Sequence, residues 1–128
     1  MPVEGELEDV LRAAREAGAA LIAAHPYSLE QCKNSPRPTG GFAANWSSLK
    51  PLVDRIELFN RDELFAWTSG AGVPAVATGD FHRREHLASW KTLIPCGKTA
   101  HDVVDYLAGP ASVLLARFEA GRAQSLAA

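Results

Sequence analysis

The spacing of apolar residues in the first part of the chain predicts a helix followed directly by a buried strand. In residues 7–18 the apolar side chains recur at helical spacing, Ala, Glu and Arg fill the positions between them, and Gly18 is a typical helix stop. Residues 19–24 form a short, continuously apolar run that ends at a His-Pro pair, which is typical of a strand buried on both faces. Residues 26–43 are rich in Pro, Gly, Ser and Asn, and we expect a long loop with at most one helical turn.

The alternation of helix and strand continues to residue 118. We expect helices over 45–55, 60–72 and 99–109, strands over 56–59, 73–78, 91–96 and 112–118, and a helical turn near 83–90. Pro51 places the start of the first of these helices, or a kink in it, near that residue. Asn60 is the expected cap of the second helix, with Glu63 at its third position. Strands that alternate with helices in this way predict an α/β fold with parallel strands.

Composition and charge narrow the class of protein. The chain has 128 residues, 47% hydrophobic and 22% charged, which is enough to bury a core as one domain or as part of a larger one. A formal charge of −2, from mixed acidic and basic residues, favours neither a nucleic acid nor a membrane surface as a partner. No apolar run approaches the roughly 20 residues needed to span a bilayer, so we expect a cytoplasmic protein. Cys32 and Cys96 follow no metal or redox spacing and are expected to be free thiols.

Polar side chains stand where three successive predicted strands end. His25 follows the first strand, Glu57 and Asn60 lie at the end of the second, and Asp80 and His82 follow the third. In parallel α/β folds, functional groups gather at the carboxyl ends of the strands. Imidazole and carboxylate together suit zinc, manganese or iron, and such a metal generates hydroxide and polarises a phosphoryl oxygen. The pattern therefore predicts metal-dependent hydrolysis at these strand ends.

Three segments together resemble later motifs of a known family. "LIAAHPYS", "VDRIELFN" and "VATGDFHR" are similar, in order and spacing, to motifs of the polymerase and histidinol phosphatase (PHP) family of metal-dependent phosphoesterases. The resemblance extends from about residue 7 to about residue 108. The Gly-Asp-x-His element after a strand is the most specific part of the resemblance, and the His-Pro pair after a strand is the second most specific. The family fold is a distorted β/α barrel similar to a TIM barrel.

The resemblance implies roles for individual residues. His25, Asp80 and His82 match metal ligands of the family, and Asp80 and His82 would carry the catalytic centre. Glu57 and Asn60 match a strand motif that we place beside the site without assigning them as ligands. Four arginines lie in the loops at the same strand ends: Arg37, Arg61, Arg83 and Arg84. Each is expected either to be solvated or to clamp a phosphate. Arg83 and Arg37 are the candidate substrate-binding residues.

The resemblance also implies that the site is incomplete. The family opens with a His-x-His strand and supplies a bridging glutamate from its first half, and this sequence has no counterpart of either. A closed barrel needs on the order of 200 to 250 residues. We therefore expect residues 1–118 to form the carboxyl-terminal part of a PHP-like domain, a partial (β/α) barrel that lacks the first strands, and residues 119–128 to be a frayed tail. Weak metal affinity and little turnover are expected of the isolated chain.

Simpler interpretations remain open for the same residues. His25 could be a hydrogen-bonded structural histidine, Asp80 could cap the helical turn that follows it, and His82 could lie on the surface. His86 and His101 are expected to be exposed helix residues.

Three functions are compatible with these residues. The first is a metal-dependent phosphoesterase acting on a phosphorylated small molecule or nucleotide. The second is a non-catalytic PHP-like remnant, a regulatory or interaction module whose exposed sheet edge is covered by homodimerisation or by a missing amino-terminal half. The third, a metal-free small-molecule binding module, is disfavoured because the sequence lacks a Gly-rich phosphate loop.

Overall fold

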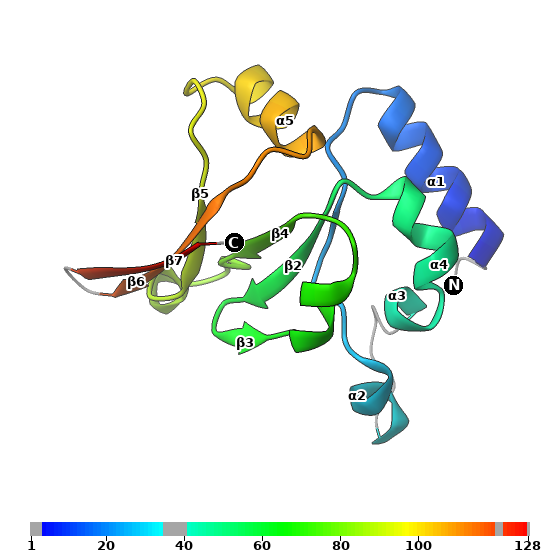
Figure 1. The fold of residues 1–128 in the computed structure, drawn as a ribbon, viewed down its shortest axis with the longest axis horizontal. Coiled ribbons are helices and arrows are strands. Elements are labelled where there is room, and N and C mark those ends of the chain that lie inside the picture. Colours follow the sequence, from blue (N-terminus) through cyan, green and yellow to red (C-terminus); the bar gives the residue numbers. More distant parts are fainter. Residues whose placement is uncertain (1–3, 35–40, 120–121, 128) are drawn as a thin grey trace.

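A mixed α/β fold with a parallel sheet is seen in the computed structural model, which describes residues 4–34, 41–119 and 122–127 (Figure 1). In the first sheet β2 (Arg55–Asn60) pairs in parallel with β1 (Ile22–Ala23) and with β4 (Ala75–Thr78). The last two residues of β2 pair antiparallel with β3 (Glu63–Leu64). The expected parallel strands are therefore present, although β1 is shorter than the apolar run that predicts it.

A second sheet corrects two expectations about the end of the chain. β5 (Trp90–Leu93), β6 (Leu114–Glu119) and β7 (Arg122–Ala127) form an antiparallel sheet. The strand expected over 91–96 therefore runs antiparallel to its neighbour. The chain leaves β5 at one end of the sheet, passes through α5, and enters β6 from that same end (Figure 1). Residues 119–128, expected as a frayed tail, include β7 paired with β6. The described strands form two separate sheets and no closed barrel.

The helices are short apart from the first and the last. They are α1 (Glu4–Glu16), α2 (Leu29–Asn34), α3 (Gly41–Ala44), α4 (Trp46–Leu49) and α5 (Ala100–Ala108), with 3-10 turns at η1 (Lys50–Leu52), η2 (Ala66–Gly70) and η3 (Arg84–Leu87). Gly18 has φ +88° just after α1, and the Thr99 hydroxyl caps α5 by accepting from the Asp102 N–H at 3.1 Å, both as expected. The expected loop over residues 26–43 contains both α2 and α3, which is more helix than one turn. None of the helices in the described ranges is long and apolar enough to cross a membrane.

The expected helix over residues 60–72 is wrong. The chain turns back after Arg61, which has φ +53°, and forms the hairpin of β2 and β3 before η2. The Asn60 side chain bonds to Glu57 instead of capping a helix. The reversal brings the Phe65 N–H within 2.8 Å of the Leu58 carbonyl and buries Phe65 to 1% exposure. Burial of this aromatic ring overrides the local helical pattern.

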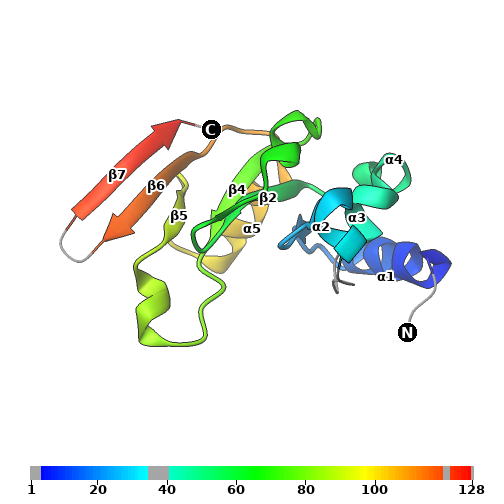
Figure 2. The same cartoon turned by 90° about the horizontal axis from the view of Figure 1, so that it is seen from below.

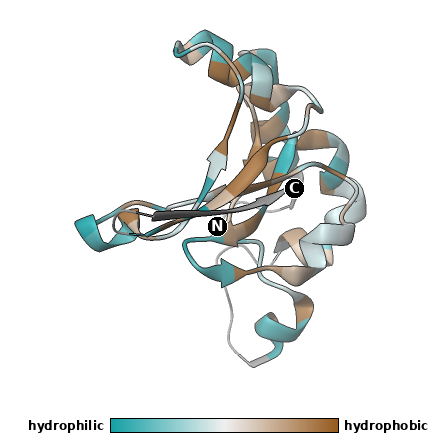
Figure 3. Cartoon of the chain, turned by 60° about the vertical axis from the view of Figure 1, so that its left-hand side comes forward, coloured by the Kyte–Doolittle hydropathy of each residue, from teal (hydrophilic) through white to brown (hydrophobic). Residues whose placement is uncertain are grey.

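Two hydrophobic clusters hold the elements together. The first joins the first sheet to the short helices and contains the buried residues Ala23, Ile56 and Ala71, with Phe42, Trp46, Trp67 and Val73 packed against them. The second joins the two sheets and α5 and contains Ala77, Val113 and Leu115, with Leu58, Phe59, Trp90, Ile94 and Tyr106 around them. Figure 2 shows the two sides of the molecule, with β5–β7 on one side of β2 and β4 and with α1–α4 on the other. Hydrophobic residues gather along the strands in Figure 3.

A buried arginine fastens the start of β2 to the end of α5. Arg55 has no exposed surface, and its guanidinium donates to the carbonyl oxygens of four residues at 2.7–3.2 Å; these are Tyr106, Leu107, Gly109 and Ala111. A cation suits the carboxyl end of a helix, where carbonyl groups lack intrahelical partners. Burial lowers the pKa of the Arg55 guanidinium, and nearby Tyr106 and Asp54 oppose that shift.

Candidate functional site

Three strands of the first sheet end on backbone of unusual conformation. His25 follows β1 with φ +30°, Arg61 follows β2 with φ +53°, and Asp80 follows β4 with φ +41°. They are the non-glycine residues with positive φ in the described part of the chain. Such conformations cost on the order of 1 kcal/mol each and cluster at functional sites. Because β1, β2 and β4 are parallel neighbours, the three residues lie at the same edge of the sheet.

The carboxyl group of Glu57 joins these three strand ends. Its side chain is 2% exposed. One oxygen accepts from the His25 N–H at 2.5 Å and from the Asn60 amide at 3.1 Å, while the other accepts from the Thr78 hydroxyl. Glu57 lies on β2, His25 follows β1, and Thr78 ends β4, so one buried group fixes how the three ends stand relative to one another. Asn60 is likewise buried here and bonds to Glu57.

Asp80 and His82 form a pair at the end of β4. The His82 Nδ1 lies 2.8 Å from the Asp80 backbone oxygen and 3.3 Å from the Asp80 carboxylate. The tautomer with its proton on Nδ1 donates to that carbonyl and leaves the lone pair of Nε2 free. Bonds of this type from Nδ1 to a backbone carbonyl orient metal-binding imidazoles in proteins. The His82 side chain is largely exposed, so Nε2 is open to a ligand.

The donors do not complete a metal site within the described residues. No group of three or more His, Cys, Asp or Glu side chains in those ranges is placed to hold a metal ion. The structure thus brings Asp80 and His82 together and does not gather His25 into one group with them. Catalytic zinc sites use three protein ligands. Asp80 and His82 alone do not fit a complete metal centre.

His86 differs from the exposed helix residue that we expected. Its side chain is half-buried in η3, and Nδ1 accepts from the backbone N–H groups of His82, at 2.9 Å, and Arg83, at 3.3 Å. Desolvation lowers the pKa of His86, the cationic groups of Arg61, Arg83 and His82 lower it further, and Asp80 opposes them. His101, in contrast, is exposed and pairs with Asp105 at 3.0 Å.

The role of His86 predicts a pH-dependent stability. Because its folded-state pKa is lowered, the contribution is complete above the ordinary histidine pKa of about 6.5 and is lost as the pH falls below that value. Protonation of Nδ1 removes the acceptor for both N–H groups. We expect the urea midpoint to fall more between pH 7 and pH 5 in the native chain than in His86→Asn, whose amide oxygen accepts and does not titrate. Equal losses in the two proteins would contradict this role.

The basic loop residues differ in their contacts with Asp80 and His82. Arg37 lies outside the described residues, and the Arg83 side chain is exposed. Arg61 instead contacts both Asp80 and His82. Lys91 lies close to Gly79, and its Nζ donates to the Ser89 hydroxyl at 2.6 Å and to the His86 carbonyl at 3.2 Å.

Gly79, which precedes Asp80, lies close to Lys91. A Cβ atom there would lie 2.7 Å from Lys91 Nζ, the far end of a flexible side chain, so a small shift of the lysine would accommodate it. Burial lowers the pKa of Lys91, the nearby Arg117 lowers it further, and Asp62 opposes the shift.

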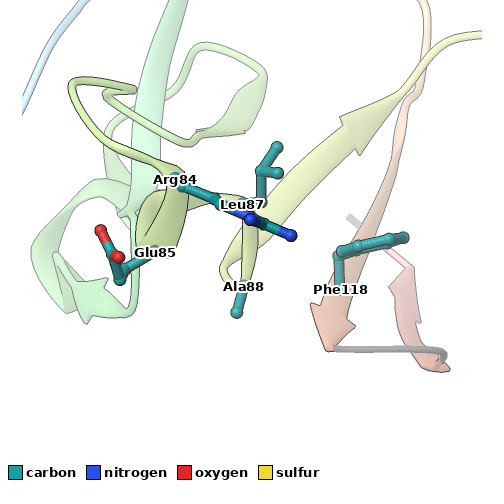
Figure 4. A pocket seen from close by; sticks show the side chains of 5 residues that line it. All are labelled: Arg84, Glu85, Leu87, Ala88 and Phe118. Carbon is teal, nitrogen blue, oxygen red and sulfur yellow. The ribbon is translucent and has the colours of Figure 1, made fainter.

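A cavity of about 370 Å³ lies beside this loop, between η3 and β6. Figure 4 shows Arg84 and Leu87 on one side of it and Phe118 on the other; Glu85 and Ala88 complete its lining. Asp80 and His82 are not among the lining residues.

Comparison with known proteins assigns no family. The sequence matches none of the protein-family models against which it was scanned, and a search of the curated proteins found no match either. The chemistry of the strand ends is therefore the basis of the functional proposal.

Proposed function

We propose that this chain carries part of a metal-dependent phosphoesterase site of the PHP type, with His25, Asp80 and His82 as its metal ligands. The observation that carries the proposal is the meeting of three parallel strand ends at the carboxyl group of Glu57, with the candidate ligands directly beyond them. The motifs "LIAAHPYS", "VDRIELFN" and "VATGDFHR" support it by their resemblance to that family.

The residues present suggest a division of roles. Asp80 and His82 would hold a zinc, manganese or iron ion from one side, and His25 would approach it from the neighbouring strand end. A metal bound there supplies hydroxide and polarises a phosphoryl oxygen. Because the described donors are too few for a complete centre, further ligands would come from a segment or chain outside these residues. Low turnover of the isolated chain is therefore part of the proposal.

Binding of inorganic phosphate in the presence of Mn²⁺ tests this proposal without requiring turnover. We expect phosphate to broaden in ³¹P NMR when Mn²⁺ and the native chain are both present, more than with either alone. Asp80→Asn should abolish the added effect, since asparagine tolerates the positive φ and removes the charge. His101→Gln, on exposed α5 surface, is the matched control and should behave as the native chain. Phosphate binding that needs no metal and survives Asp80→Asn would overturn the proposal.

Exposed leucines on one face of the second sheet favour a second candidate function. Leu93 and Leu114 stand directly opposite each other on β5 and β6 and are 49% and 38% exposed. We propose as the alternative a non-catalytic interaction module that pairs with a second copy over this face. Sedimentation of a dimer that dissociates on Leu114→Lys, together with no Mn²⁺ binding, would favour this alternative over the phosphoesterase.

A further inference from the structure

The cavity beside η3 is formed by two segments that lie far apart in the sequence. One wall is the segment from Arg84 to Ala88, and the other is Phe118 on β6 (Figure 4). The Phe118 N–H donates to the Ser89 carbonyl at 3.0 Å, so a backbone bond fixes the two walls relative to each other. The cavity volume of about 370 Å³ lies within the range of about 300–1,000 Å³ that small-molecule sites occupy. The cavity is therefore a defined part of the fold with room for a small organic molecule.

The walls of this cavity are mainly apolar. Leu87 and Phe118 are 49% and 46% exposed, and Ala88, which is also exposed, completes the apolar part of the lining. Single exposed apolar side chains are common on protein surfaces, but here three of them line the same cavity. A ring that enters the cavity removes apolar surface of these side chains from water, which favours binding. The apolar part of a ligand would therefore contact Leu87 and Phe118.

Arg84 supplies a positive charge at these apolar walls. Figure 4 shows its side chain pointing toward Phe118, while the carboxyl group of Glu85 points the other way. No hydrogen bond or ion pair joins the Arg84 side chain to another residue in the described part of the chain. Arg117, on the same strand as Phe118, instead pairs with Asp62 at 2.8 Å. A guanidinium group without a partner in the chain can form two parallel bonds with a carboxylate or a phosphate.

We propose that this cavity binds a small aromatic molecule that carries a carboxylate or phosphate group. The ring contacts Leu87 and Phe118, and the anionic group pairs with the Arg84 guanidinium. Both features of the ligand are needed, because apolar walls alone do not select an anion and an exposed ion pair alone contributes little. The inference goes beyond the proposed function and does not depend on it, since Asp80 and His82 do not line the cavity.

Titration of the native chain without metal, followed by ¹H–¹⁵N NMR, tests this proposal with benzoate and phenyl phosphate as probes. Acetate, inorganic phosphate and benzyl alcohol are the matched controls, since each lacks either the ring or the charge. We expect the preferred aromatic anion to bind about tenfold more tightly than any control and to shift the amide signals of residues 84–88 and 118. The ratio of the two aromatic affinities decides between carboxylate and phosphate. If neither aromatic anion binds more tightly than the controls, the proposal is wrong.

Variants of the lining test the roles of the individual side chains. Arg84→Gln removes the charge of an exposed side chain and should weaken binding of the aromatic anion about tenfold while leaving that of benzyl alcohol unchanged. Phe118→Thr keeps a residue suited to a strand and should weaken binding of both. Arg12→Gln, on the exposed face of α1, is the control and should match the native chain. Native affinity for the aromatic anion in Arg84→Gln would overturn the proposal, and this result can be obtained even if Phe118→Thr does not fold.

Discussion

Replacement of Arg55 by leucine is expected to lower the free energy of unfolding by at least about 3 kcal/mol. The substitution removes the donors of four hydrogen bonds to carbonyl groups at and after the end of α5. A hydrogen bond to a charged group contributes about 1.5–3 kcal/mol, and an orphaned buried carbonyl costs about 1–3 kcal/mol. The cost of desolvating the guanidinium offsets part of this sum. Urea unfolding followed by circular dichroism measures the difference.

Two further variants separate the hydrogen bonds of Arg55 from its charge. Arg55→Lys keeps the cation, but a single ammonium group cannot reach four carbonyl oxygens, so a smaller loss of about 2 kcal/mol is expected. Arg12→Leu removes an exposed arginine that pairs with Glu8 and should change the stability by less than about 1 kcal/mol. An Arg55→Leu protein as stable as Arg12→Leu would show that the connection between β2 and α5 is dispensable.

Replacement of Glu57 by alanine should cost about 3 kcal/mol and disorder the candidate site. Three donors lose their acceptor: the His25 N–H, the Asn60 amide and the Thr78 hydroxyl. The buried side chain also leaves a cavity. Unfolding free energy gives the overall cost, and hydrogen exchange of the His25 amide reports the strand end directly. We expect that amide to lose its protection in Glu57→Ala.

Glu57→Gln is the matched control for this prediction. The glutamine oxygen can accept from His25 and Asn60, and its amide can donate to the Thr78 hydroxyl, which then acts as acceptor. A cost of about 1 kcal/mol and retained protection of the His25 amide are expected. Equal stability of the alanine and glutamine variants would contradict the role of Glu57 as the group that joins the three strand ends.

The sequence predicted correctly those helices and strands whose formation depends on neighbouring residues in the chain. The apolar spacing and Gly18 predicted α1, and Thr99 predicted the start of α5. The alternation of helices and apolar runs predicted parallel strands, and β2 and β4 pair in this way. The helix expected over residues 60–72 was wrong because Asn60 and Glu63 imitate a capping pattern. The decisive contacts, the bond from Asn60 to Glu57 and the burial of Phe65, depend on the folded sheet.

The candidate site, too, could be predicted from the sequence only where local residue types determine it. Residue types at strand ends pointed to His25, Asp80 and His82. The structure places Asp80 beside His82 and does not gather His25 into one group with them in the described part of the chain. Arg61 was expected to be only one of several basic loop residues, since its contact with Asp80 spans 19 positions and depends on its positive φ. His86 was expected to be exposed because nothing in its helical segment reveals that its ring accepts two backbone N–H groups.

The proposed function requires that the ends of β1, β2 and β4 form one metal-binding edge. Substoichiometric Mn²⁺ added to the native chain tests it through the histidine ring signals in ¹H NMR, because the paramagnetic ion broadens nearby protons even when it binds weakly. We expect the signals of His25 and His82 to broaden together, the signal of His101 to stay sharp, and Asp80→Asn to remove the effect. Broadening of His82 without His25, or broadening no greater than that of His101, would rule out a shared metal site at these strand ends.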